Sequence, residues 1–232
     1  ADVCSSDLAY LTQSPAIIGP YGEFLASQRM DNLSSVHSSV AAFVDVKPTE
    51  DIAVMACFDH EEVGSATRSG ACGPFLEDIL VRIAEGMGIT GASYRAMIAR
   101  SSCVSSDAGH GVHPNYVEKF DPANHPLLNE GSLLKINANQ RYATDGVGGA
   151  LWQRACTAAG VPTQDFVSNN SVPCGSTIGP LTATRLGMLT VDVGVPLMSM
   201  HSTRELAGTA DLAYLSKALG AYWAGLEPIT SK

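Results

Sequence analysis

The sequence predicts an α/β fold in which a mixed, largely parallel sheet is sandwiched by helices. Hydrophobic residues make up 45% of the 232 positions and charged residues only 16%, so the chain has enough apolar material for a substantial core. Short continuous apolar runs, typical of strands covered on both faces, alternate with longer segments of helical periodicity. No internal repeat or low-complexity linker interrupts this order. The length is within the range of one large domain or two small ones.

In the first half of the chain, two helices and two strands are expected. The helices are residues 32–46, after the cap candidates Asp31 and Asn32, and residues 74–88, with Pro74 near the start. The strands are the apolar run 51–59, expected to be buried, and residues 99–109, which lead into a polar turn. Residues 1–24 are turn-rich and are expected to form extended pieces or a crossover.

In the second half, the same alternation continues to a long C-terminal helix. The elements expected are a strand at 132–139, a helix at 147–160, a short helix at 177–187, one or two strands at 188–200 and a helix at 203–225. In such sheets, ligands bind at the carboxyl ends of the strands. Polar residues that follow strands are therefore the candidates for a functional site.

Composition and charge exclude several functional classes. Lys and Arg number 14 against 23 Asp and Glu, a formal charge of -9, and no basic cluster favours nucleic acid or an anionic membrane. No apolar stretch approaches the roughly 20 residues of a membrane span, and the first residues, "ADVCSSDLAY", lack signal-peptide features. The six cysteines form no CxxC pair, so we expect reduced thiols and a cytoplasmic protein.

Carboxylates and histidines follow the predicted strands. Glu61 and Glu62 follow the first strand, Asp107 the second and His201 the run 188–200, while Asp31 lies at the head of the first helix. These side chains suit zinc, manganese or cobalt. Two consecutive glutamates fit a ligand beside a general base. Taken singly, Asp31 also fits a helix cap, Asp107 an Asx turn and His201 a core histidine.

Six blocks of sequence carry a resemblance to a known family. They are "LTQSPAIIGPYGEFLASQRMDNLSS", "FDHEEVGSATRSGA", "SSDAGHGVHPNY", "KINANQRYAT", "CGSTIGP" and "MHSTRE". In this order they closely resemble the aspartyl aminopeptidases, dizinc exopeptidases that assemble as tetrahedral dodecamers. The resemblance implies a dizinc exopeptidase-like catalytic domain, a homo-oligomer, and peptide substrates with an N-terminal Asp or Glu.

The resemblance also implies a role for each metal-site residue. Asp31 would bridge two divalent ions, zinc or alternatively manganese or cobalt. Glu62 and His201 would complete one metal site, Asp107 would bind the second ion, and Glu61 would be the general base.

A pocket for the acidic side chain of the substrate is also implied. An N-terminal Asp or Glu needs a cation or several donors, and Lys135, in an otherwise apolar strand, is the natural candidate. The alternative is an exposed lysine on an edge strand. In similar enzymes His113 and Tyr142 would line the same pocket, and His110 is a candidate for stabilising the oxyanion.

The chain departs from the family pattern in its length. Similar proteins are about twice as long and carry an N-terminal His-x-Asp motif and an inserted dimerisation domain, and neither is present here. We therefore expect residues 1–24 to be a re-entry segment from that domain, and residues 25–232 to be an incomplete catalytic domain lacking its first strands. A missing strand would leave an open sheet edge. The alternatives are a dizinc aminopeptidase or deacylase of other specificity, and an inactive fragment or assembly module.

Overall fold

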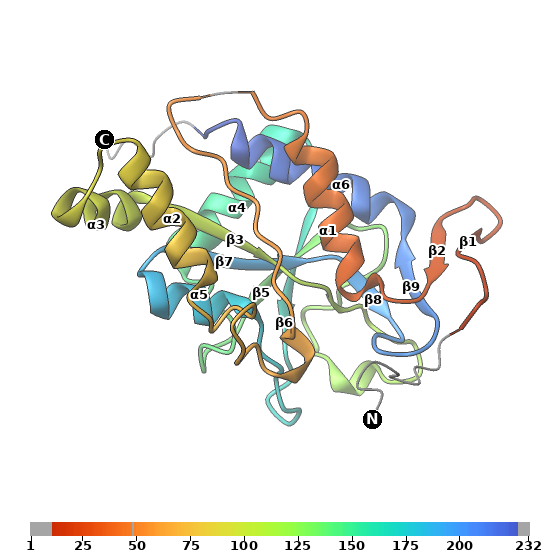
Figure 1. Ribbon diagram of the computed structural model, residues 1–232. Helices are drawn as coiled ribbons and strands as arrows, with labels where there is room; N and C mark the ends of the chain where they lie inside the picture. The colour runs from red at the N-terminus through yellow and green to blue at the C-terminus, as the bar shows by residue number, and fades with distance from the viewer. Residues whose placement is uncertain (1–10, 48, 227–232) are drawn as a thin grey trace, which may run out of the picture.

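The computed structural model describes residues 11–47 and 49–226, which form two sheets covered by helices (Figure 1). The first sheet has the strand order β3-β7-β5-β6, formed by β3 (Ser102–Ser106), β7 (Leu189–Gly194), β5 (Ser132–Ile136) and β6 (Thr163–Val167). β3 pairs parallel with β7 and β5 parallel with β6, whereas β5 and β7 are antiparallel. This confirms the predicted α/β class with a mixed, largely parallel sheet.

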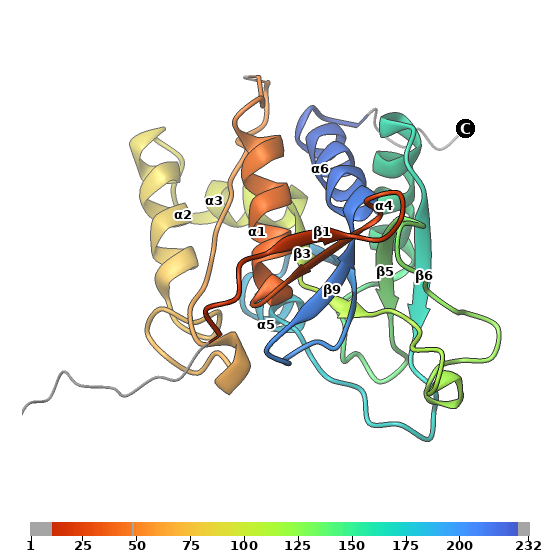
Figure 2. The same ribbon diagram turned by 90° about the vertical axis from the view of Figure 1, so that its right-hand side faces the viewer.

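A second, mainly antiparallel sheet was not predicted. Its strand order is β1-β2-β9-β8-β4, formed by β1 (Ala16–Ile18), β2 (Phe24–Ser27), β9 (Glu205–Gly208), β8 (Pro196–Met198) and β4 (Gly109–His110). In Figure 2 the edge formed by β1, β2 and β9 faces the viewer. β7 ends at Gly194 and β8 begins at Pro196, so the apolar run 188–200 supplies one strand to each sheet.

Helices cover the first sheet and enclose the core. α4 (Gly146–Ala159) and α6 (Thr209–Trp223) contact β7 and β5 respectively, α1 (Met30–Phe43) packs on α6, and α5 (Ile178–Leu186) contacts β7 and β3. The core cluster includes Trp152, Val191, Val193 and Leu215, all fully buried. Among the described residues, no helix is both long and apolar enough to cross a membrane.

The prediction of a buried strand at 51–59 is wrong. These residues are extended but pair with no strand, and several are exposed. A cavity of about 980 Å³ separates them from β3, which is the edge strand of its sheet. The apolar side chains of this run line the cavity. No described strand lies close enough to form backbone hydrogen bonds with it.

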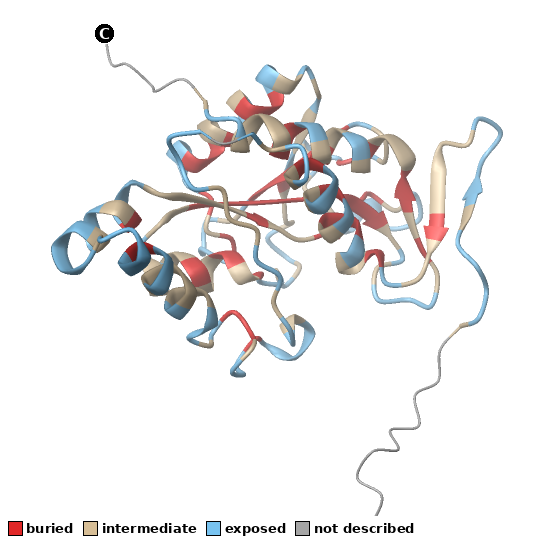
Figure 3. Ribbon diagram, turned by 45° about the horizontal axis from the view of Figure 1, so that its top comes forward, coloured by how far each residue is buried: buried red, intermediate tan, exposed pale blue. Residues whose placement is uncertain are grey.

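The same cavity explains the unusual exposure of α2 (Phe75–Gly86) and α3 (Gly91–Arg100). Ala84 is the sole buried residue of α2, and Ile98 that of α3, and both helices are largely exposed or intermediate in Figure 3. Leu76, Leu80 and Ile83, spaced along one face of α2, line the cavity instead of packing on a sheet.

Other boundaries differ from the predictions. The predicted helix 203–225 is a strand, β9, followed by a shorter helix, because the residues before Thr209 pair with β2 and β8. The periodicity did not reveal α3 or the polar strand β6. Residues 11–24 form part of the β1–β2 hairpin, and the rest of the 1–24 prediction, residues 1–10, lies outside the described residues.

Candidate metal centre

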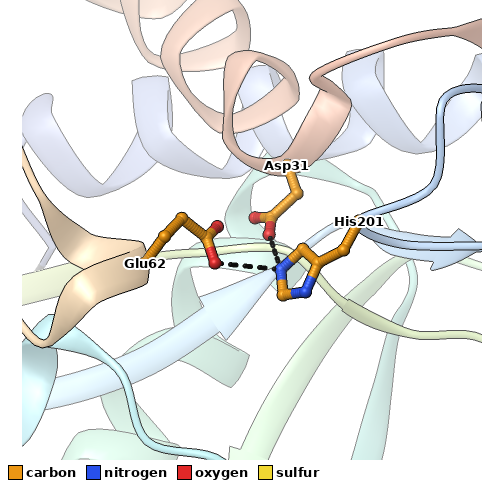
Figure 4. Close-up of side chains that lie close together, drawn as sticks. All are labelled: Asp31, Glu62 and His201. Carbon is orange, nitrogen blue, oxygen red and sulfur yellow. Dashed lines mark hydrogen bonds and ion pairs between the residues drawn. The ribbon is translucent and has the colours of Figure 1, made fainter.

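Asp31, Glu62 and His201 point toward one another from three separate segments of the chain, and Glu62 and His201 are exposed (Figure 4). The Nε2 atom of His201 lies 2.9 Å from Oδ2 of Asp31 and 3.2 Å from Oε2 of Glu62. One ligand atom from each residue falls within 4.8 Å of the other two. Two carboxylate oxygens and an imidazole nitrogen form a donor set that suits zinc.

Local backbone geometry aims these side chains at one another. Asp31 lies in the first turn of α1 but has non-helical φ and ψ of −82° and 106°, and its carboxylate meets His201 instead of capping the helix. Glu62 belongs to the short 3-10 turn Glu61–Val63, and His201, with φ of 64°, lies in the turn between β8 and β9. The helix-cap alternative for Asp31 is therefore wrong.

Burial and neighbouring carboxylates both shift the pKa values of the cluster. Burial, followed by the carboxylates of Asp107 and Glu62, raises the pKa of Asp31 to about 7. Partial burial acts to lower the pKa of His201, but Glu62 and Asp31 outweigh it and raise the pKa overall. A bound cation would relieve the repulsion among these carboxylates, so the residues present fit a divalent metal.

Glu61 precedes Glu62 but is not part of the three-residue cluster. Burial, followed by the charges of Asp107 and Glu62, raises its pKa above the usual value for a glutamate. A carboxylate with a raised pKa beside a metal site accepts a proton more readily near neutral pH. The two consecutive glutamates thus occupy different environments.

Asp107 pairs with Lys135 and does not join the cluster. Nζ of Lys135 lies 3.1 Å from Oδ2 of Asp107 and donates to the carbonyl of Ala108 at 2.7 Å. The lysine is buried, at 2% exposure, and its amine lies 5.5 Å from the centre of the Tyr142 ring. The alternative of an exposed edge-strand lysine is wrong, because β5 is an inner strand and Lys135 is enclosed.

The other predicted pocket residues line a second cavity of about 370 Å³. His110, His113 and Tyr142 all contribute to its wall, and Lys119 adds a further basic side chain. No aspartate or glutamate is among its described lining residues. Burial lowers the pKa of His110, and the charges of Lys135 and His201 lower it further, which favours the neutral imidazole.

Two residues that hold the site were missed by sequence reasoning. Asn32 donates to the carbonyl of Ser106 at 2.9 Å and accepts from the amide of Ala108 at 3.2 Å, so it brackets Asp107 on both sides. Glu205 accepts from the backbone amides of Asp31 and His201. Glu205 lies inside the "MHSTRE" block, but its burial could not be read from the sequence.

A known protein family matches most of this chain. A family model described as "Aminopeptidase I zinc metalloprotease (M18)" matches residues 1–223. The chain belongs to the M18 family.

M18 relatives are similar in both sequence and fold. A probable M18 family aminopeptidase 2 of Streptomyces coelicolor is 48% identical over 219 residues, which cover 93% of this chain and 51% of the relative. The Ape4–Nbr1 complex structure matches with a TM-score of 0.85 and 37% identity, over 91% of this chain and 41% of that one. The S. cerevisiae mApe1 dodecamer matches at 0.80 and 28%, over 93% and 50%. The chain thus spans about half the length of these M18 proteins.

Proposed function

We propose that the protein containing this chain is a zinc-dependent aminopeptidase that removes an N-terminal Asp or Glu from peptides. The observation that carries the proposal is the convergence of Asp31, Glu62 and His201, with Glu61 beside them but outside the cluster. The family model, which describes a zinc metalloprotease, supports the same chemistry.

In the proposed site, Asp31, Glu62 and His201 would hold one divalent ion, and Asp31 and Asp107 would share in holding a second. Bound zinc would supply a Lewis acid that polarises the scissile carbonyl and lowers the pKa of a water molecule. Glu61 takes the proton of the attacking water and passes it to the departing amine, a role that its raised pKa favours. His110 would donate a hydrogen bond to the developing oxyanion, a role that the lowered pKa of its imidazole supports.

Acidic specificity is proposed from the second cavity. Its wall carries His110, His113 and Lys119 and, among the residues that the structure describes, no carboxylate, although the chain as a whole has a net charge of -9. Lys135 does not line this cavity; its amine lies 5.5 Å from the centre of the Tyr142 ring and is bound to Asp107, so it would have to leave Asp107 to bind a substrate carboxylate. A side-chain carboxylate of the substrate would find positive charge there.

We propose that residues 25–232 form a catalytic domain completed by further strands, with residues 1–24 leading in from a dimerisation domain. The unpaired edge of β3 and the cavity beside it support this proposal. A homo-oligomer, a dodecamer as in the mApe1 structure, is proposed for the whole protein. The described cysteines, all unpaired, support a cytoplasmic location.

The first test separates metal binding from proton transfer. Zinc affinity is measured by titration calorimetry on this chain, and hydrolysis of Asp- and Leu-peptides is measured after mixing it with the N-terminal half of the S. coelicolor relative. Glu61→Gln should leave zinc affinity unchanged and lower turnover by about 10²–10⁴-fold, as expected for loss of a general base. Asp45→Asn, an exposed carboxyl just after α1, is the control and should change neither quantity.

Three outcomes would contradict parts of the proposal. A wild-type chain that binds no zinc would contradict the metal site, and full turnover by Glu61→Gln would contradict the role of Glu61. Equal turnover of the Asp- and Leu-peptides would contradict the acidic specificity. Lys135→Met and Lys119→Met then show which lysine sets the preference, since only loss of that lysine should lower the ratio of Asp to Leu turnover.

A further inference from the structure

Glu205 is a buried carboxylate that touches the backbone of both segments carrying Asp31 and His201. It is 2% exposed, and none of the ion pairs among the described residues includes it. Its Oε2 atom accepts from the amides of Met30 at 2.5 Å and Asp31 at 3.0 Å, and its Oε1 atom accepts from the amide of His201 at 2.7 Å. The carboxylate of Glu205 thus accepts hydrogen bonds from three backbone amides in place of an ion pair.

These hydrogen bonds join two segments that are far apart in the sequence. Asp31 and Glu205 are 174 residues apart in sequence, whereas His201 is 4 residues from Glu205. Glu205 begins β9, which pairs with β2 just before α1, so the strand pairing delivers the carboxylate to the head of α1. Hydrogen bonds to an ionised carboxylate are shorter and stronger than neutral ones, which makes this link between the segments stiff.

The backbone at both ends of this link is in an unfavourable conformation. Arg29, directly before Met30, has φ of 58°, and His201 has φ of 64°, a left-handed region that side-chain-bearing residues rarely adopt. Such conformations persist where surrounding bonds hold them. Glu205 binds the amide of His201 itself and the amides of Met30 and Asp31, the first and second residues after Arg29.

We propose that Glu205 is a positioning residue that sets the spacing of Asp31 and His201 for metal binding. It does not touch the metal or the substrate; it fixes the two backbones from which the ligands project. The inference rests on the proposed function, because it assigns Glu205 a role at that same metal site. Loss of outer partners of this kind typically weakens metal affinity by 10–100-fold.

The test compares Glu205→Gln with a matched variant elsewhere in the chain. Gln keeps the size of the side chain, but it has one acceptor oxygen and places an NH₂ group against a backbone donor. Asp211 is also fully buried and accepts from two backbone amides, those of Asn129 and Gly131, so Asp211→Asn makes the same kind of change away from the cluster. Each protein is titrated with zinc by calorimetry and with cobalt(II) by visible absorption.

Glu205→Gln should weaken zinc affinity by about 10–100-fold and change the visible cobalt bands, which report ligand geometry. Asp211→Asn should lower thermal stability while keeping the wild-type zinc affinity and cobalt spectrum. A folded Glu205→Gln protein with both wild-type values would overturn the inference, as would an equal loss of affinity in both variants.

A second variant covers the case in which Glu205→Gln does not fold. Glu205→Asp keeps the charge but shortens the side chain by one methylene group, so the acceptor oxygens lie farther from the backbone amides. This variant should also weaken zinc affinity and alter the cobalt spectrum. Wild-type values for this variant would overturn the inference. If the wild-type chain itself binds neither metal, the proposed metal site fails and this inference fails with it, a result distinct from a change seen in the variant alone.

Discussion

At the residue scale, buried carboxylates without cations hold this molecule together. Asp192 accepts from the amide of Ala143 and the hydroxyl of Thr177, both at 2.6 Å, and Asp211 accepts from two amides of the 129–131 loop. Like Glu205, both are 0–2% exposed. Each joins segments that are distant in sequence, so these charges act as structural acceptors in place of surface ion pairs.

Asp211 predicts a dependence of stability on pH. Burial raises its pKa from 3.8 to about 6. Between those values the unfolded chain has lost this proton and the folded chain has kept it, so the free energy of unfolding falls as pH rises. The shift corresponds to about 3 kcal/mol. Urea unfolding from pH 4 to pH 6 should show the advantage of wild type over Asp211→Asn shrinking by about two thirds of this amount, and parallel curves would contradict the prediction.

The sequence revealed the residues that a metal needs but not those that hold them. Carboxylates and a histidine after apolar runs are visible as a pattern, and the structure brings three of them together. The acceptor role of Glu205 depends on which backbone amides face it, and no spacing in the sequence shows that. The burial of Lys135 follows from its apolar strand. Its bond to Asp107 depends on the strand order, because Lys135 is in β5, Asp107 follows β3, and β7 lies between these two strands.

At the element scale, the start of α5 is fitted to β7 through a glycine. A Cβ atom at Gly179 would lie 2.2 Å from Oδ2 of Asp192, within the carboxylate that holds Thr177 and Ala143. The glycine of the "CGSTIGP" block is therefore required by a close approach of helix and strand.

Gly179→Ala should lower the free energy of unfolding by about 1–3 kcal/mol, because the added methyl group displaces Asp192 from its two donors. Gly146→Ala is the control, since a Cβ atom there meets nothing within 4 Å and lies at the start of α4. Alanine at that position should be neutral or stabilise by up to about 1 kcal/mol. Equal unfolding curves in urea for the two variants would show that Asp192 can move away from the added methyl group without a loss of stability.

Helices and strands were predictable from the sequence where the spacing of apolar residues was regular. The predictions failed where pairing with another strand decides whether a segment is a strand. The helices α1, α2 and α4 have regular apolar spacing and were found within a few residues. The run 51–59 has the composition of a strand, yet a strand also needs a neighbour, and the cavity stands where that neighbour would bond. The sequence predicts a helix over the residues of β9 because these four residues show no distinct alternation of apolar and polar side chains.

At the scale of the whole molecule, one side of the first sheet is open. β3 offers an unpaired edge, the apolar face of α2 lines a cavity, and the hydroxyls of Ser35 and Ser105 are buried there without a partner among the described atoms. An open edge next to an apolar surface favours pairing with another strand.

Hydrogen exchange tests whether a strand enters this space. In the isolated chain, the amides of Ser102–Ser106 that point away from β7 should exchange rapidly. Adding the N-terminal half of the S. coelicolor relative should slow their exchange by at least tenfold and leave β5, an inner strand, unchanged. Rapid exchange in the mixed sample, despite a complex in size-exclusion chromatography, would place the contact elsewhere.

The link between Asp31, His201 and Glu205 has a consequence for biosynthesis. Asp31 and Glu62 are translated before the imidazole and the carboxylate that complete their surroundings, which come 170 and 174 positions after Asp31. A nascent or prematurely terminated polypeptide therefore carries the early carboxylates without a finished cluster. The three side chains can therefore come together only after His201 has been synthesised, and a product that ends before it lacks the cluster.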